Sequence, residues 1–189
     1  MRDVDALLEE MDSYEWDDVK DYSHPGYEAA APKRFKADIE RYGLELNGSV
    51  LDVCSGPVSL ASVYDDVVAT DIEPSMVKNM REHGTRAIIA DMRDLPFDPD
   101  SFDYAVSFWP PMAIYEDKAQ GVEDFIEDLF TIAREKVIIQ SSPMSRYLPE
   151  RFNNYLESCD GRMIVYDAAA YKQDMAAEET LKDIYGMVA

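Results

Sequence analysis

Cysteine, histidine and basic residues are scarce in this chain of 189 residues. It has 2 cysteines, Cys54 and Cys159, and 2 histidines, His24 and His83. Two distant cysteines without a CxxC pair supply neither a disulfide framework nor a tetrahedral set of zinc ligands. The sequence therefore favours reduced thiols, a cytoplasmic location and the absence of a metal site.

Positive charge is also in short supply. Lys and Arg total 18 against 39 Asp and Glu, which gives a formal net charge of −21. Such a field repels the phosphates of nucleic acids and the headgroups of anionic lipids, so neither a nucleic acid nor a membrane is expected as a partner. Acidity spread along a whole chain also fits a protein kept soluble in high salt, where screening weakens this repulsion.

Long hydrophobic runs are missing as well. The first twenty residues carry acids throughout, which a secretory leader does not tolerate, so secretion is not expected. The longest weakly polar stretch, Tyr104 to Tyr115, is shorter than a membrane span and is interrupted by Pro110 and Pro111. Hydrophobic residues nevertheless make up 47% of the chain, enough for the core of one compact domain.

Short apolar β-branched runs alternate with helix-like stretches, which is the pattern of an α/β protein with a mostly parallel, doubly wound sheet. The predicted strands are Ser49 to Cys54, Val67 to Thr70, Ala87 to Ala90, Tyr104 to Phe108, Val137 to Gln140 and Arg162 to Tyr166. The predicted helices are Val4 to Met11, Tyr27 to Tyr42, Pro57 to Tyr64, Pro74 to His83, Val122 to Arg134 and Leu148 to Ser158. The ending DIYGMVA, residues 183–189, fits either a strand or a helix.

The most informative segment is VLDVCSGPVSLAS, residues 50–62, where a strand that bears an acid runs into a turn of small residues. Gly56 has no β-carbon, Ser55 is small, and Pro57 suits a first helical turn, so a nucleotide-like ligand can approach the backbone N–H groups. Asp52 lies near the end of the strand, where its carboxylate is placed to orient this loop. These residues predict a ligand site at the carboxyl ends of the central strands.

The next two strands also end in acids. Asp71 follows the second strand, the position where a carboxylate accepts hydrogen bonds from ribose hydroxyls. Asp91 and Met92 follow the third strand and pair an acceptor for an exocyclic amine with a side chain that packs on a flat ring. These acids extend the predicted ligand site across three consecutive strands.

These motifs, in this order, resemble the class I S-adenosylmethionine-dependent methyltransferases over about residues 49 to 140. The family's first loop typically reads VLDLGCGPG, and VLDVCSGPV departs from it at Cys54 and Val58. The resemblance implies a Rossmann-like sheet of about seven strands in the order 3-2-1-4-5-7-6, with helices on both faces. The two predicted helices ahead of the first strand indicate an N-terminal helical cap over residues 1–46, which forms one domain with the methyltransferase part over residues 47–189.

The same resemblance implies S-adenosylmethionine as the cofactor. Its expected contacts are Asp52, Cys54, Ser55, Gly56, Pro57, Asp71, Ile72, Asp91, Met92 and Ser107. In this assignment Asp71 holds the ribose, Ile72 flanks the adenine, and Asp91 with Met92 contacts the adenine edge and ring.

The end of the fourth predicted strand, Ser107 to Pro111, belongs in the family to the substrate side. Methyl transfer from a sulfonium depends mainly on positioning and desolvation, so no fixed catalytic residue can be identified, and Ser107 and Trp109 are the only candidates. The segment WPPM superficially matches the Asp/Asn-Pro-Pro-Tyr signature of amino-group methyltransferases. Trp109, however, cannot supply the carbonyl oxygen of that motif, so adenine methylation is not predicted.

The sequence therefore predicts a methyltransferase that acts on a small molecule, with the acceptor and the oligomeric state open. A catalytically degenerate module that binds the cofactor or a partner protein is the main alternative, because Val58 replaces the last glycine of the loop. A dinucleotide-dependent oxidoreductase fits less well, since it requires glycine at all three positions of G-x-G-x-x-G.

Overall fold

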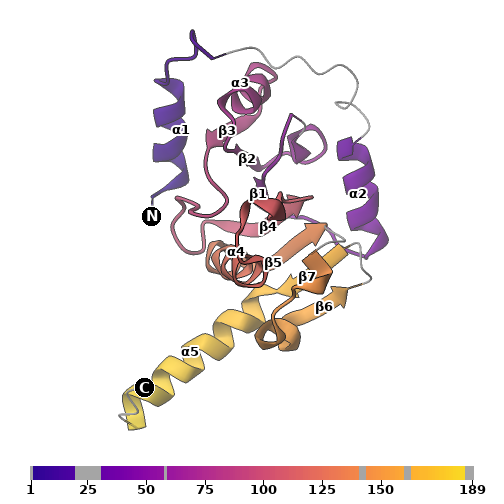
Figure 1. Ribbon diagram of the computed structural model, residues 1–189, viewed down its shortest axis with the longest axis vertical. Coiled ribbons are helices and arrows are strands. Elements are labelled where there is room, and N and C mark those ends of the chain that lie inside the picture. The colour runs from indigo at the N-terminus through magenta and orange to yellow at the C-terminus, as the bar shows by residue number, and fades with distance from the viewer. Residues whose placement is uncertain (1, 20–30, 58, 141–143, 160–162, 186–189) are drawn as a thin grey trace.

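The computed structural model describes residues 2–19, 31–57, 59–140, 144–159 and 163–185. Its centre is a seven-stranded sheet in the order β3-β2-β1-β4-β5-β7-β6 (Figure 1). The strands are β1 (Val50–Val53), β2 (Val67–Asp71), β3 (Arg86–Ile89), β4 (Phe102–Phe108), β5 (Ala133–Gln140), β6 (Leu156–Cys159) and β7 (Met163–Asp167). The five strands from β3 to β5 run parallel, whereas β7 is antiparallel to both of its neighbours. The predicted fold class and strand order are confirmed.

Helices cover both faces of this sheet (Figure 1). They are α1 (Val4–Asp12), α2 (Ala31–Arg41), α3 (Pro74–Glu82), α4 (Lys118–Ile132) and α5 (Ala168–Tyr185). One face packs its apolar side chains against α1, α4 and α5, and the opposite face packs against α2 and α3. Because both faces are covered, the central strands are hydrophobic almost without interruption, which is why the sequence revealed them.

The two N-terminal helices lie on opposite faces. Leu7 and Met11 of α1 pack in the hydrophobic cluster that also contains residues of α4. Phe35 and Ile39 of α2 pack in a separate cluster on the opposite face of the sheet. The division into a cap and a methyltransferase domain stays a prediction.

Two predicted helices are wrong. In the described part of Pro57 to Tyr64 only a single 3-10 turn forms, η1 (Leu60–Ser62), because Ser59 caps it and the chain turns into β2 soon afterwards. Leu148 to Ser158 is not a helix either: a 3-10 segment, η4 (Glu150–Tyr155), leads directly into β6. The edge strand β6 alternates between half-buried and exposed residues, and its pairing with β7 overrides the local pattern.

Some boundaries fall outside the described residues. These include Tyr27 to residue 30 of the second predicted helix, Arg162 of the last predicted strand, and Val58 of the loop. In the C-terminal ending, residues 183–185 complete α5, so the helical alternative holds for them, and residues 186–189 lie outside the description.

Candidate cofactor site

The carboxyl ends of β1, β2 and β3 meet at one edge of the sheet, because these neighbouring strands are parallel. A cavity of about 260 Å³ opens there. It is lined by Cys54, Asp71, Ile72, Ala90, Asp91, Met92, Arg93, Pro111 and Ile114. Five of the ten predicted cofactor contacts are therefore brought together, and the other five lie around this cavity or behind it.

The loop after β1 is held in a strained, open conformation. Cys54 and Gly56 both have positive φ angles, 59° and 60°, in the left-handed region that glycine adopts without cost. A β-carbon added at Gly56 would meet no atom within 4 Å, so space lies in front of the loop. Ser55 fixes the turn, since its N–H donates to the Thr70 carbonyl at 2.9 Å and its hydroxyl donates to the Asp52 carbonyl at 2.8 Å.

Asp52 lies behind the loop and does not line the cavity. Its carboxylate is 2% exposed and accepts hydrogen bonds from the Leu60 N–H at 2.9 Å and the Ser59 hydroxyl at 3.1 Å. Burial raises its pKa to about 6 in spite of these hydrogen bonds. Asp52 is therefore a positioning residue that ties the end of β1 to η1.

Asp71 links the loop to the end of β2 and faces the cavity. One carboxylate oxygen accepts a hydrogen bond from the Gly56 N–H at 2.9 Å, and the other accepts one from the Glu73 N–H, also at 2.9 Å. Burial raises its pKa above the usual value, and these two bonds act in the opposite direction. Each carboxylate oxygen has two lone pairs, so Asp71 keeps capacity to accept two further hydroxyl donors.

Ile72 and Met92 give the cavity apolar walls. Ile72 is 58% exposed, unusually so for a large aliphatic side chain, whereas Met92 is only 3% exposed. The sulfur of Met92 lies 3.4 Å from the sulfur of Cys54. Burial raises the pKa of the Cys54 thiol to about 12, so the thiol stays neutral and behaves as a small apolar group.

Arg93 is the one charged residue of the cavity that the sequence analysis missed. Its Nε lies 3.0 Å from both oxygens of Asp91, and its backbone N–H donates to the same carboxylate at 2.9 Å. These contacts lower the pKa of Asp91 and keep it ionised. The sequence did contain a signal for this contact, namely an arginine two residues after an acid at the end of a strand. At that spacing a turn brings the backbone N–H of the later residue to the carboxylate of the earlier one.

Ser107 and Trp109, the two catalytic candidates, are placed very differently. Ser107 is completely buried, and its hydroxyl donates to the Val53 carbonyl at 2.9 Å, so it joins β4 to β1. Trp109 is 48% exposed just beyond β4 and has a φ of 55°. Its ring meets that of Phe35 from α2 edge to face, with the ring centroids 5.7 Å apart.

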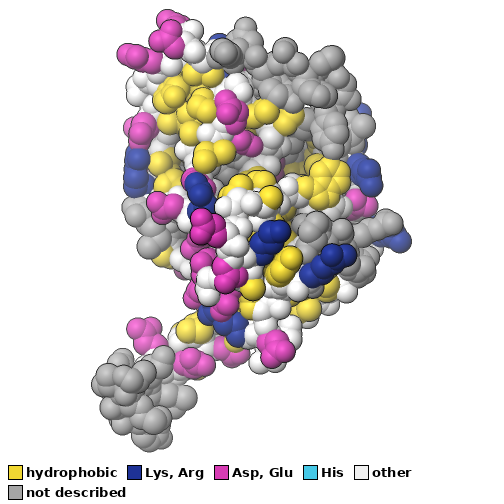
Figure 2. Space-filling model, in the orientation of Figure 1, with side chains coloured by type: hydrophobic (Ala, Val, Ile, Leu, Met, Phe, Trp, Pro, Cys, Tyr) yellow, Lys and Arg dark blue, Asp and Glu magenta, His cyan; other side chains and the backbone are white. Residues whose placement is uncertain are grey.

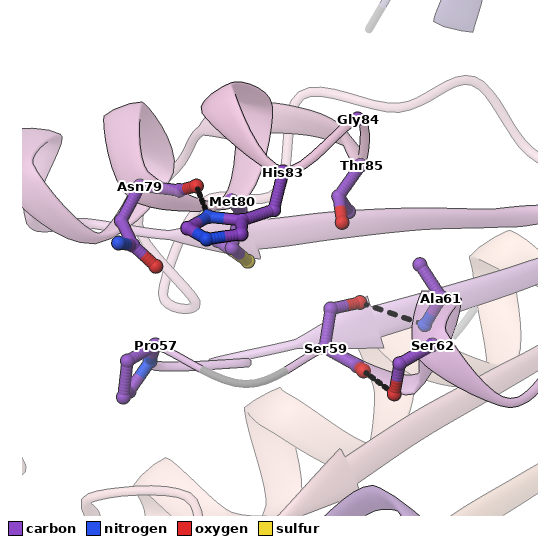
Figure 3. Close-up of a pocket in the computed structure, with 9 residues that line it drawn as sticks. All are labelled: Pro57, Ser59, Ala61, Ser62, Asn79, Met80, His83, Gly84 and Thr85. Atoms are coloured by element: carbon purple, nitrogen blue, oxygen red, sulfur yellow. Dashed lines mark hydrogen bonds between the residues drawn. The ribbon is translucent and has the colours of Figure 1, made fainter. Parts of the chain in front are cut away.

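A second cavity, of about 230 Å³, lies between η1 and the C-terminal end of α3 (Figure 3). Pro57 lines this cavity instead of the first one. Figure 3 shows His83 turned back onto its own helix, with Nδ1 2.8 Å from the Asn79 carbonyl. The lining contains no carboxylate, lysine or arginine, so the acid-bearing cavity is the better candidate site.

The described part of the chain offers neither a metal-binding cluster nor a membrane-spanning helix. No group of three or more His, Cys, Asp or Glu residues there is arranged to hold a metal ion. No helix in that part is long and apolar enough to cross a membrane.

Comparison with known proteins defines the class of this domain. Residues 50–135 match the family model described as a methyltransferase domain. No curated protein matches the chain. Together with the strand order 3-2-1-4-5-7-6, the match shows that residues 50–135 belong to a methyltransferase domain of the class I type.

Solved structures share the fold at low sequence identity. TrmN from Thermus thermophilus is 21% identical with a TM-score of 0.54, over 72% of this chain and 48% of TrmN. Protein 1320 of Thermoplasma acidophilum is 17% identical with a TM-score of 0.51, over 88% and 96% of the two chains. PH0226 from Pyrococcus horikoshii is 20% identical with a TM-score of 0.50, over 58% and 52%. The chain thus spans about half the length of TrmN and PH0226.

The residues of the cavity suit the adenosyl part of S-adenosylmethionine. Asp71 retains acceptor capacity for two hydroxyl groups, and Ile72 and Met92 offer apolar surface for a flat ring. The open space before Gly56 leaves room beside the loop. A volume of about 260 Å³ lies just below the usual range for small-molecule pockets, so it suits part of such a ligand.

Proposed function

We propose that this chain binds S-adenosylmethionine at the ends of β1, β2 and β3 and transfers its methyl group to a small molecule. The observation that carries the proposal is the position of Asp71, whose carboxylate joins the Gly56 N–H to the end of β2 and still faces the cavity. A carboxylate at this position accepts hydrogen bonds from the two hydroxyls of a ribose, and its negative charge repels a phosphate.

The residues in and around the cavity have different roles in this proposed function. Asp71 binds the ribose, Ile72 and Met92 hold the adenine between them, and Asp91 accepts a hydrogen bond from its amine. Ser55 and Gly56 hold the loop open beside the methionine part, and Asp52, Ser107 and Pro57 support that loop and its strands from behind. When bound, the cofactor supplies a methyl group activated by a sulfonium. The neutral Cys54 thiol does not compete for it, because a thiol reacts as the thiolate.

The acceptor is proposed to be a small molecule and not a nucleic acid. A net charge of −21 opposes the approach of a polyanion, and acidic side chains are spread over the face in Figure 2, gathering over α4. Both cysteines are free, which suits a protein that acts in the reducing cytoplasm.

Isothermal titration with S-adenosylmethionine and S-adenosylhomocysteine, at low and at molar salt, tests the cofactor site. We expect a micromolar dissociation constant, about −8 kcal/mol. Asp71→Ala should weaken binding at least tenfold, whereas Asp66→Ala, which removes an exposed acid paired with Arg86, should not. The absence of binding by the folded wild-type protein at both salt concentrations would favour the alternative, a degenerate module.

A further inference from the structure

The outer end of β5 carries a buried polar group that the cofactor site does not use. Gln140 is 7% exposed, and within the described part of the chain its Oε1 atom has no hydrogen-bond partner. Its Nε2 donates to the carboxylate of Asp38 on α2 at 2.9 Å. Since a buried acceptor without a hydrogen-bond partner destabilises the protein, a donor supplied by a ligand would remove this penalty.

Gln140 also fixes the position of Trp109. The Trp109 N–H donates to the Gln140 carbonyl at 2.7 Å, so one residue holds both the carboxylate of Asp38 and the start of the segment after β4. A second connection runs through Phe35, which stacks on Phe108 with the centroids 3.8 Å apart and meets Trp109 edge to face. Phe35 and Asp38 are three residues apart on α2 and therefore share a helix face. Asp38 and Trp109 are thus connected in two ways, through Gln140 and through the helix turn that carries Phe35.

The chemistry of this group selects for a cation. Asp38 is half-buried, and one amide donor occupies a carboxylate that can accept several more hydrogen bonds. Trp109 exposes 48% of its surface, and an indole face attracts ammonium groups. Asp38 and the orphaned Gln140 Oε1 offer acceptors to a ligand, and Trp109 adds the π face of its indole. The net charge of −21 additionally raises the local concentration of cations.

We propose that the acceptor molecule carries an ammonium group and that this group binds between Asp38 and Trp109, with Gln140 orienting the carboxylate. This inference rests on the proposed methyltransferase function, because it names the class of its substrate. It places the acceptor at the end of β4 and β5, on the face covered by α2 (Figure 1).

The test compares two probes of equal shape, phenethylammonium and 2-phenylethanol, by isothermal titration in the presence of S-adenosylhomocysteine. We expect the ammonium to bind at least tenfold more tightly than the alcohol. Asp38→Asn and Trp109→Leu should each remove most of this difference, and Gln140→Leu should reduce it. Glu40→Gln is the matched control, because it removes the same charge from an exposed position of α2 and should change the affinity less than twofold.

Two results would overturn the inference: equal affinity for the two probes, or a loss in Glu40→Gln as large as in Asp38→Asn. The second result would mean that the ammonium responds only to the overall charge. Thermal unfolding of each variant ensures that a loss of binding is not a loss of fold. Titration of Asp38→Asn with S-adenosylhomocysteine separates the two proposals, because its affinity should be unchanged if only the ammonium site is damaged. A wild-type protein that binds the ammonium but no cofactor would contradict the proposed function and leave the ammonium site intact.

Discussion

The buried carboxylate of Asp52 accepts a hydrogen bond from the backbone N–H of Leu60, eight residues further along the chain, at 2.9 Å. This contact joins the end of β1 to η1 and gives the loop between them a fixed point. It also requires an acid to stay in the protein interior, where the charged form is poorly solvated.

Asp52 should therefore make stability depend on pH. Its pKa rises from 3.8 to about 6 on folding, so the native state binds the proton more tightly than the unfolded chain. The contribution of protonated Asp52 to the free energy of unfolding is fully present below pH 4, and it is lost as the pH rises through about 6. Asp52→Asn should be more stable than the wild type at pH 8, by about 1–3 kcal/mol.

The measurement is urea unfolding of both proteins between pH 4 and pH 8. Asp128, whose pKa is also raised to about 6, is present in both and cancels in the difference. A difference in unfolding free energy that stays constant with pH would show that Asp52 is not the titrating group.

The two cysteines should react very differently. Cys159 is exposed, whereas burial raises the pKa of Cys54 to about 12 and leaves almost no thiolate at pH 8. Iodoacetamide should therefore add one group to the native protein, on Cys159, and two after unfolding in urea. Mass spectrometry of peptides locates the modification, and native Cys159→Ser should remain unmodified. Rapid labelling of Cys54 in the native state would contradict a half-buried thiol that stays neutral.

Gly121 should resist replacement although it lies within α4. Alanine in place of an exposed helical glycine gains about 1 kcal/mol. Here, however, a β-carbon would lie 2.2 Å from Cγ and 2.7 Å from Cβ of Tyr115, atoms near the backbone that cannot move away freely. Gly121→Ala should thus destabilise the protein by about 1–3 kcal/mol, as overpacking does.

Thermal unfolding measures this effect. Gln120→Ala, at the neighbouring exposed position, should change the midpoint little. Combining Gly121→Ala with Tyr115→Ala removes the overlap and should cost less than the sum of the two single variants. A gain in stability for Gly121→Ala alone would mean that Tyr115 does not occupy this space.

The parallel strands were predictable from the sequence, whereas two segments predicted as helices are not α-helical in the structure. Strands β1, β2 and β4 are buried on both faces, so hydrophobicity alone marks them. The edge strand β6 has one neighbour and half-exposed residues, so its structure depends on pairing with β7. Local pattern could not distinguish it from a helix, since the deciding hydrogen bonds come from another segment.

The sequence by itself determined the class of sheet, the loop after the first strand and the acids at the ends of the next two strands. These are local features, because each acid directly follows the strand that positions it. Only the tertiary structure decided that Ser107 is buried against β1 and that Asp38 meets Gln140 across 102 positions of sequence. The physical reason is that such contacts form only when the sheet and helices pack, and a single sequence carries no local pattern for them.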